Sequence, residues 1–343
     1  MHKIVIHKAG GYEQLTLESF PDPQPGEGEL LIEVKATGVN FADCLVRMGV
    51  YSSAKEFVGW PITPGFEVSG VVAALGNGVT QFTVGQKVVA LTLFGGYATH
   101  LVVPATQVFS LPEELDFAQG AALPTVFITA YYALFDLANA KKGDQILVHS
   151  AGGGVGSALV QLGKVAGCKV VGVVGASHKV DFVKSLGADA VIDKSSSDLW
   201  AEAKKLAPHG YDIILDANGT ETLKEDYRHL SAGGKLVVYG FHSMFTKDAG
   251  KPNWFKVAWQ YWNIPKFNPF NMITENKSVL AFNLSYLMPK KELIRTSAEQ
   301  IFRWIKEGKV QPPPIQTFPL EHAAEAQRAL ESGQTVGKIV LTT

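Results

Sequence analysis

The sequence predicts an α/β protein with two domains: a β-rich domain, and a nucleotide-binding domain built on a doubly wound parallel sheet of six strands. Three observations lead to this prediction. The chain has 343 residues, more than one hydrophobic core usually accommodates. Short β-rich runs fill the chain to about residue 123, whereas strands alternate with helices after Pro124. An apolar strand near residue 145 runs directly into a glycine-dense turn and a helix.

The composition is that of a packed globular protein. Apolar residues make up 46% of the chain and charged residues 18%, which is too apolar for a disordered protein. The 31 basic and 32 acidic residues nearly balance, so the chain has no large positive electrostatic field to hold nucleic acid. We therefore expect no nucleic-acid partner. The most apolar stretch, residues 117–138, is interrupted by polar residues, so we interpret it as a buried helix and expect no transmembrane segment.

Cysteine usage points to a reducing compartment. Cys44 and Cys168 lie far apart in the sequence and in different predicted domains, so they form neither a disulfide framework nor a cysteine-rich metal lobe. The apolar run within residues 1–8 is too short for a secretory signal and is typical of a first strand. We therefore expect a cytoplasmic protein.

The first region alternates turns with β-rich runs. After the first strand, further strands are expected at residues 30–34, 68–73, 86–91 and 98–103. Glycine and proline turns separate them. This arrangement indicates an antiparallel sheet or a partly open barrel.

The second region has the rhythm of βαβ units. Six strands are expected, which make two mononucleotide-binding halves. They are residues 145–150, 169–174, 190–193, 212–216, 235–239 and 279–283. An aromatic insertion at 254–262 separates the last two strands. A helix at 290–307 and a strand at 338–342 follow, and we expect them to return to the first domain.

The glycine-dense turn is the most informative motif. Its spacing is Ala151-x-Gly153-x-x-Gly156, with alanine where the Rossmann fingerprint usually has its first glycine. Glycine lets a pyrophosphate approach the free N–H groups at the start of the following helix. We therefore predict a dinucleotide phosphate site between Ser150 and Ser157; the alternative is a merely tight strand-to-helix turn.

The end of the second predicted strand indicates which dinucleotide binds. An NAD site usually has a carboxylate there for the ribose 2′-hydroxyl. Here the chain offers Gly175, Ser177 and Lys179 instead, which suits a 2′-phosphate and favours NADPH. Lys194, after the third strand, is a second candidate cation. The alternative is that Lys179 is only a solvated lysine at a helix start.

Three segments together carry a family resemblance: residues 148–156, residues 64–71 (Pro-Gly-Phe-Glu-Val-Ser-Gly-Val) and residues 38–43 (Gly-Val-Asn-Phe-Ala-Asp). They resemble the medium-chain dehydrogenase/reductase superfamily, in its zinc-free quinone oxidoreductase, or zeta-crystallin-like, branch. The insertion at 254–272 and the segment 276–284 look most like the synaptic-vesicle membrane protein homologues within that branch.

The resemblance implies a GroES-like catalytic domain at 1–124 and 286–343, which faces a Rossmann NADPH-binding domain at 125–285 across a cleft. It places Asn40, Asp43 and Tyr51 near the nicotinamide as candidate catalytic residues. It also implies a homodimer joined through the sixth strands. The residues expected to bind the coenzyme are Thr129, Ala151, Gly152, Gly153, Gly154, Val155, Gly156, Gly175, Ser177, Lys179, Lys194, Asn218, Tyr239, Gly240, Phe241, Phe282, Asn283 and Leu284.

No metal site is expected. The resemblance implies that Asn40 and Phe66 occupy the positions at which the zinc alcohol dehydrogenases of the superfamily carry a Cys and a His ligand. A zinc site needs three or four converging ligands. The nine histidines show no such spacing, so a surface or satisfied-core role is expected for each, including His149.

These points favour NADPH-dependent, metal-independent reduction of quinones or α,β-unsaturated carbonyls by hydride transfer. Asn40 would donate an amide hydrogen bond, and Tyr51 a hydrogen bond or a proton through water, unless the two residues only form turns or pack. Asp43 is interpreted as a structural carboxylate rather than a base. The alternative function is a membrane- or partner-binding protein that uses the aromatic, lysine-bearing stretch 254–270, although such aromatics usually form a lid, a pocket or a subunit contact.

Overall fold

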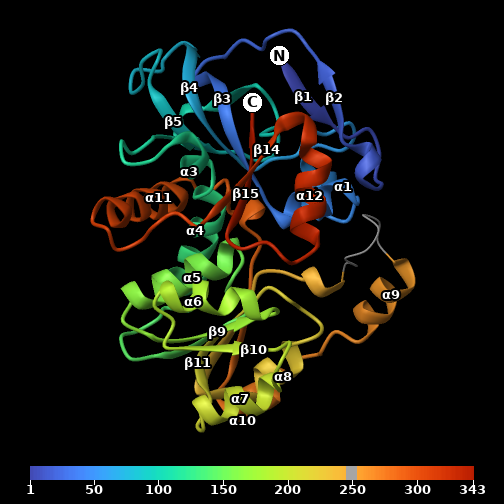
Figure 1. The fold of residues 1–343 in the computed structure, drawn as a ribbon, viewed down its shortest axis with the longest axis vertical. Helices are drawn as coiled ribbons and strands as arrows, with labels where there is room; N and C mark the ends of the chain where they lie inside the picture. Colours follow the sequence, from blue (N-terminus) through green and yellow to red (C-terminus); the bar gives the residue numbers. More distant parts are fainter. Residues whose placement is uncertain (245–252) are drawn as a thin grey trace. The chain divides into compact units, whose positions relative to one another are not determined.

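The computed structural model describes residues 1–244 and 253–343, and these form two compact units (Figure 1). One unit comprises Met1–Ile128 and Ser285–Thr343. The other comprises, among the described residues, 129–244 and 253–284. Each unit has its own main sheet.

The first unit is built on a seven-stranded, mostly antiparallel sheet in the order β14-β15-β3-β4-β5-β7, with β6 paired to β3. The central strand β3 places Leu30, Ile32 and Val34 on one buried face, as the two-residue period of a strand requires. A separate two-stranded sheet pairs β1 with β2. The strands of this unit are β1 (His2–Val5), β2 (Thr16–Ser19), β3 (Glu29–Val39), β4 (Glu67–Leu75), β5 (Lys87–Leu91), β6 (His100–Pro104), β7 (Val108–Ser110), β14 (Ile315–Pro319) and β15 (Lys338–Thr342).

The C-terminal segment returns to this sheet, as predicted. β15 runs antiparallel to β3, with Ile339 opposite Val39, and α12 packs against β15 and β14. The predicted helix at 290–307 is present and is one residue shorter at each end. The helices of the unit are α1 (Phe41–Arg47), α2 (Ser52–Phe57), α3 (Phe117–Ala121), α11 (Lys291–Lys306) and α12 (Ala323–Glu331), together with the start of α4 (Pro124–Tyr131).

The prediction of one buried helix over residues 117–138 is wrong in part. Asp116 caps α3 by accepting a hydrogen bond from the backbone N–H of Gln119 at 2.7 Å, and α3 ends at Ala121. A new helix, α4, begins at Pro124, because proline has no N–H to donate and is tolerated only in a first helical turn. A π-helical turn at Tyr132–Leu137 then follows. The stretch is largely but not wholly buried, since Asp136 is exposed, and it consists of three pieces.

The second unit contains the predicted six-stranded parallel sheet, in the order β10-β9-β8-β11-β12-β13. This order is that of two mononucleotide-binding halves. Because both faces of a parallel sheet are covered, its strands are continuous apolar runs; Leu147, Ile214 and Leu236 are all fully buried. The strands are β8 (Gln145–Val148), β9 (Lys169–Val174), β10 (Ala190–Asp193), β11 (Tyr211–Asp216), β12 (Leu230–Val238) and β13 (Ser278–Ala281).

In the described part of this unit, six helices follow these strands or lie between them. They are α5 (Gly154–Val165), α6 (Val180–Ser185), α7 (Leu199–Leu206), α8 (Leu223–Arg228), α9 (Trp254–Trp262) and α10 (Pro269–Glu275). The last two form the aromatic insertion between β12 and β13. Over the described part of the chain, no helix has the length and hydropathy needed to cross a membrane.

Candidate functional site

The strand register of the second unit brings the predicted coenzyme residues to one edge of its sheet. Val148 lies beside Gly172 and Leu215, and Val238 lies beside Ala281. Since all these strands are parallel, the segments that leave their carboxyl ends share that edge, where α/β proteins bind nucleotides.

The glycine turn at the end of β8 is shaped for close backbone approach. Ser150 has φ of 52°, and its hydroxyl donates to Oδ1 of Asn218 at 3.1 Å. Gly153 is the N-cap of α5, whose first N–H groups have no acceptor within the helix. A Cβ on Gly156 would lie 2.2 Å from the carbonyl oxygen of Ser150, so only glycine allows α5 to pack on the turn. An anion fits such a helix start.

Lys179 lies against this turn. A Cβ on Gly152 would lie 3.0 Å from Cδ of Lys179, so the lysine stem passes over Gly152. The residue is only 9% exposed. This burial does not match the alternative of a solvated surface lysine, and it keeps a cation close to the start of α5.

Beside Ser177, a carboxylate that the sequence prediction missed organises the loop. Asp193, at the end of β10, accepts hydrogen bonds from the hydroxyls of Ser177 at 2.5 Å and Ser195 at 2.6 Å. These hydrogen bonds lower the pKa of Asp193 to about 2. The exposed Lys194 follows, and its Cε lies 3.6 Å from where a Cβ on Gly175 would be. The acid is the last residue of the third strand, so a search at the end of the second strand does not find it.

The aromatic residues predicted at the coenzyme also gather at this edge. The ring of Phe282 lies 4.8 Å from that of Tyr132 and 6.5 Å from that of Tyr239. Burial raises the pKa of Tyr239 well above its ordinary value. Phe241 packs on Gly219, where a Cβ would lie 2.4 Å from its ring.

The remaining predicted coenzyme residues differ in burial. Thr129, on α4, is 8% exposed, and Ala151 is fully buried. Gly240 passes over Ala217, whose carbonyl oxygen a Cβ would approach to 2.8 Å. Four more of the predicted coenzyme residues are half-buried. Gly154 and Val155 lie at the start of α5, and Asn283 and Leu284 follow β13.

In the first unit, Asn40 lies in a buried polar cluster. It precedes α1, and its Nδ2 donates to Oε1 of Glu67 at 2.9 Å. Its Oδ1 accepts from Nζ of Lys338 at 2.5 Å, and Lys338 also forms an ion pair with Oε1 of Glu67 at 2.7 Å. Neither Glu67 nor Lys338 was singled out from the sequence, although Glu67 lies within the segment 64–71 that carries the resemblance.

Asp43 is enclosed by donors. Its carboxylate accepts from the backbone N–H of Asn40 and of Gly65, both at 2.8 Å, and from the hydroxyl of Tyr97 at 3.2 Å. Burial raises the pKa of Asp43 to about 7. With no exposed surface, the side chain joins the start of α1 to the turn at Gly65.

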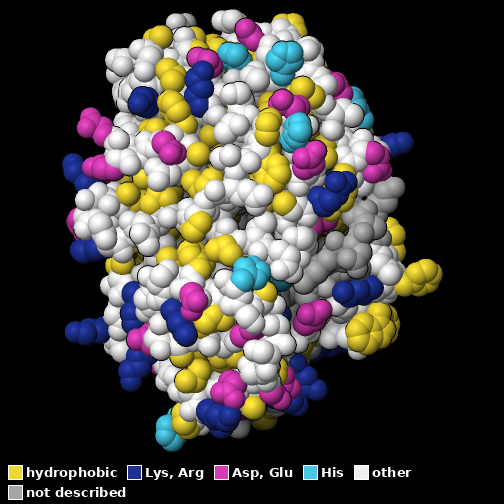
Figure 2. Space-filling view, in the orientation of Figure 1, with side chains coloured by type: hydrophobic (Ala, Val, Ile, Leu, Met, Phe, Trp, Pro, Cys, Tyr) yellow, Lys and Arg dark blue, Asp and Glu magenta, His cyan; other side chains and the backbone are white. Residues whose placement is uncertain are grey.

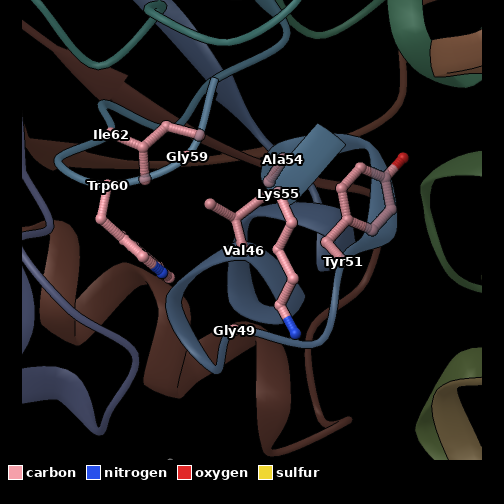
Figure 3. Close-up of a pocket in the computed structure, with 8 residues that line it drawn as sticks. All are labelled: Val46, Gly49, Tyr51, Ala54, Lys55, Gly59, Trp60 and Ile62. Atoms are coloured by element: carbon pink, nitrogen blue, oxygen red, sulfur yellow. The ribbon is translucent and has the colours of Figure 1, made fainter. Parts of the chain in front are cut away.

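Tyr51 precedes α2 and packs edge-on against Phe66, with ring centroids 5.8 Å apart. Its hydroxyl lies 2.9 Å from Oγ of Ser285. The ring also lines a shallow, open recess, shared with Val46, Lys55, Trp60 and four neighbours (Figure 3). In that view the hydroxyl of Tyr51 points away from Lys55 and Trp60, so it does not point into the recess.

The donor atoms around Asn40 do not fit a catalytic zinc ion. Phe66 offers no ligand atom and packs on Phe94 at 5.1 Å between ring centroids. Among the described residues, Glu67 alone places a carboxylate against the side-chain amide of Asn40, and Lys338 already neutralises it. A zinc site needs three or four nitrogen, sulfur or oxygen ligands that converge.

Among the described residues, three metal-ligating side chains come together at one place, in the second unit: His149, Asp216 and Asp226. All are buried, and Nε2 of His149 lies 2.6 Å from Oδ1 of Asp226, a hydrogen-bond distance. Burial raises the pKa of both carboxyl groups to about 7 and lowers that of His149 to about 4. His149 is thus a hydrogen-bonded core histidine. No spacing pattern in the sequence indicated this cluster.

Comparison with known proteins matches two parts of the chain to protein families. Residues 26–113 match the alcohol dehydrogenase GroES-like domain, and residues 186–341 match a family described as zinc-binding dehydrogenase. The synaptic vesicle membrane protein VAT-1 homolog of Homo sapiens is 35% identical over 341 residues, which are 98% of this chain and 85% of that protein.

Two quinone oxidoreductases are similar over nearly their whole length. The one from Rattus norvegicus is 32% identical over 345 residues, which cover 99% of this chain and 97% of that protein. The crystal structure of Escherichia coli quinone oxidoreductase complexed with NADPH is 27% identical, with a TM-score of 0.87 and 100% coverage of both chains.

Proposed function

Because the chain belongs to the medium-chain dehydrogenase/reductase superfamily, as a quinone oxidoreductase-like protein close to VAT-1, we propose that it reduces quinones or α,β-unsaturated carbonyls with NADPH and without a metal ion. The observation that carries this proposal is the glycine turn before α5 with Lys179 buried across Gly152. The turn suits a pyrophosphate, and the lysine suits an additional phosphate.

NADPH, when bound, supplies the hydride. The start of α5 would hold its pyrophosphate, and Lys179, Ser177 and Lys194 would recognise the 2′-phosphate. The one hydrogen of the Ser177 hydroxyl is donated to Asp193 in this structure, so Ser177 has to release that bond before it donates to a phosphate oxygen. Near the nicotinamide we place the aromatic edge formed by Tyr239, Phe241 and Phe282, together with Thr129, Asn218 and Asn283.

In the reduction of an enone, a hydride adds to the carbon β to the carbonyl, and the electrons of the C=C bond move to the carbonyl oxygen. The enolate then takes up a proton. Asn40 would stabilise the developing charge with an amide hydrogen bond, and Tyr51 would supply the proton, directly or through water. Asp43 would act by holding the start of α1, and thereby Asn40, in place.

The test is oxidation of NADPH and of NADH with 1,4-benzoquinone, 9,10-phenanthrenequinone and a simple enone, each with and without a chelator. We expect turnover with NADPH, much less with NADH, and no effect of the chelator. Loss of rate on chelation would contradict the metal-free mechanism. Absence of NADPH binding by calorimetry would remove the enzymatic proposal.

A second candidate function rests on the exposed aromatic surface of α9 and α10. Phe255, Trp262 and Phe270 are 91%, 86% and 77% exposed, and Figure 2 shows hydrophobic side chains projecting from the surface. Helix α9 carries Lys256 and no acidic residue. Aromatic rings beside cations suit the interface of an anionic bilayer. The relatives include proteins named for the synaptic vesicle membrane.

Liposome co-sedimentation separates this candidate from a reductase alone. Anionic vesicles should pellet the natural chain, and a Phe255→Ser/Trp262→Ser variant should remain in the supernatant with its NADPH affinity intact. If the natural chain does not sediment with vesicles, the membrane function is withdrawn while the reductase proposal stands.

We also propose a homodimer through β13. Within the described residues this strand pairs with β12 and no other strand, so its outer edge offers unpaired backbone groups to a second copy. A Val279→Pro variant should weaken the association, which light scattering after size exclusion measures. A monomeric natural chain at high concentration would contradict the dimer.

A further inference from the structure

The side-chain amide of Asn40 is held between two groups of opposite hydrogen-bonding character. Nζ of Lys338 lies 2.5 Å from Oδ1 of Asn40, and Oε1 of Glu67 lies 2.9 Å from Nδ2. An ammonium group has only donors and a carboxylate only acceptors. The amide therefore has one orientation, with its oxygen toward Lys338 and its nitrogen toward Glu67.

This arrangement follows from the backbone. β15 pairs with β3 so that Ile339 lies opposite Val39, which brings Lys338 next to Asn40. Glu67 is fixed at its other oxygen, because Oε2 accepts from the backbone N–H of Thr125 at 2.7 Å. Both partners of the amide are thus anchored before any substrate binds.

The three side chains differ in exposure, and this difference decides which of them can contact a substrate. Lys338 is 3% exposed and Glu67 is fully buried, whereas Asn40 is 8% exposed. A buried ammonium in contact with a carboxylate and an amide does not reach a substrate. Nδ2 of Asn40 has two hydrogens, and one of them binds Glu67; for the other, the described residues provide no acceptor.

We propose that Lys338 is a positioning residue: with Glu67 it locks the amide of Asn40 so that one N–H remains for the carbonyl oxygen of the substrate. This inference rests on the proposed reductase function and extends it to two residues without a previous role. Without Lys338 the amide oxygen loses its donor and Glu67 loses its counter-ion, so the amide is held on one side only and its second N–H is no longer aimed at the carbonyl oxygen of the substrate.

The first test is a double-mutant cycle in kcat on an enone. Asn40→Ala and Lys338→Met should each lower kcat at least about tenfold with little change in NADPH affinity, and the double variant should be no slower than either single one. Lys338→Arg, which keeps the charge and the donors, should recover most of kcat. Lys35→Met removes another lysine paired with a glutamate in the same sheet and should leave kcat unchanged. Additive losses in the cycle overturn the proposal.

A Glu67→Gln/Lys338→Met variant separates positioning from folding. It removes both buried charges, so its melting temperature should recover relative to Lys338→Met, in which Glu67 is left uncompensated. If Lys338 positions the amide, kcat stays low despite this recovery. A return of kcat together with stability shows a structural role only and overturns the proposal. This variant and Lys338→Arg carry the test if Lys338→Met does not fold.

A third measurement needs no catalysis. In the coenzyme-free protein, the two amide protons of Asn40, assigned by their absence in Asn40→Ala, should differ in chemical shift by more than those of an exposed asparagine, because one of them binds the carboxylate. The Glu67→Gln/Lys338→Met variant should bring this difference back to that of an exposed asparagine. Unchanged signals overturn the inference. A natural chain with locked amide protons but no reductase activity would instead refute the proposed function.

Discussion

The hydroxyl of Tyr51 lies 2.9 Å from the hydroxyl of Ser285, although the two residues are 234 positions apart in the chain. A second contact of the same kind follows directly, since the hydroxyl of Tyr286 donates to Oε2 of Glu56 at 2.8 Å. These two contacts fix α2 to the segment after Leu284. The phenol of Tyr51 therefore has a partner that both accepts and donates a proton.

Replacement of Tyr51 by phenylalanine should lower turnover on an enone at least about tenfold, since a positioned acid typically contributes about 10²–10⁴-fold. NADPH affinity should not change, because the substitution removes only the hydroxyl. Steady-state kinetics and coenzyme titration of the same preparation give both quantities. Unchanged turnover would exclude Tyr51 from the mechanism.

Ser285→Ala provides the companion measurement. It keeps the phenol of Tyr51 but removes its partner, so turnover should fall less than in Tyr51→Phe, and the two losses should not add. Equal and additive losses would show that the two hydroxyls act independently.

Gly156→Ala should destabilise the coenzyme-free protein by about 1–3 kcal/mol, the usual cost of overpacking. The new Cβ would lie 2.2 Å from the carbonyl oxygen of Ser150, so α5 has to move away from the turn. Gly153→Ala is the matched control, since its Cβ would meet the same oxygen at 3.4 Å, an ordinary contact. Urea unfolding compares the two; equal losses would contradict the packing argument.

The fold was largely predictable because its signals are local. Each strand of the parallel sheet is a short apolar run, and β9 and β10 have the predicted bounds. The failures have local causes as well. β8 ends two residues early because Ser150 adopts a left-handed conformation that starts the turn, and Pro124 divides the helix expected over 117–138.

The site was predictable only where a motif is contiguous. The glycine turn and Lys179 lie within one βαβ unit, so spacing alone indicated them. Glu67 and Lys338 come together through the pairing of β15 with β3, and Asp193 meets Ser177 through neighbouring strand ends. Contacts of this kind depend on the strand order of the sheet, which periodicity does not specify.

Lys179→Met should raise the Kd for NADPH about 10- to 100-fold and leave that for NADH unchanged, because a charge-assisted hydrogen bond to phosphate contributes about 1.5–3 kcal/mol. Methionine keeps the apolar stem over Gly152. The control is Lys184→Met, an exposed lysine on α6. Fluorescence titration with both coenzymes measures the effect, and equal weakening for NADPH and NADH would show that Lys179 does not bind the 2′-phosphate.

Asp43 should make the stability of the protein depend on pH in a direction opposite to that of a carboxylate in a salt bridge. Burial raises its pKa to about 7 in the folded state, whereas an unfolded aspartate has a pKa of about 3.9. Between these values the folded chain keeps a proton that the unfolded chain releases. The favourable contribution is thus complete below about pH 4 and is lost as the pH rises through about 7.

Comparison with Asp43→Asn isolates this contribution from His149, Asp216 and Asp226, which also have shifted pKa values. The free energy of unfolding of the natural chain should fall relative to that of Asp43→Asn between about pH 4.5 and 7.5, and the difference should level off above that range. Asp181→Asn, an exposed aspartate on α6, should leave the slope unchanged. If the natural chain instead gains stability relative to Asp43→Asn as the pH rises, the backbone N–H groups of Asn40 and Gly65 hold Asp43 ionised, and the effect of these hydrogen bonds exceeds that of burial.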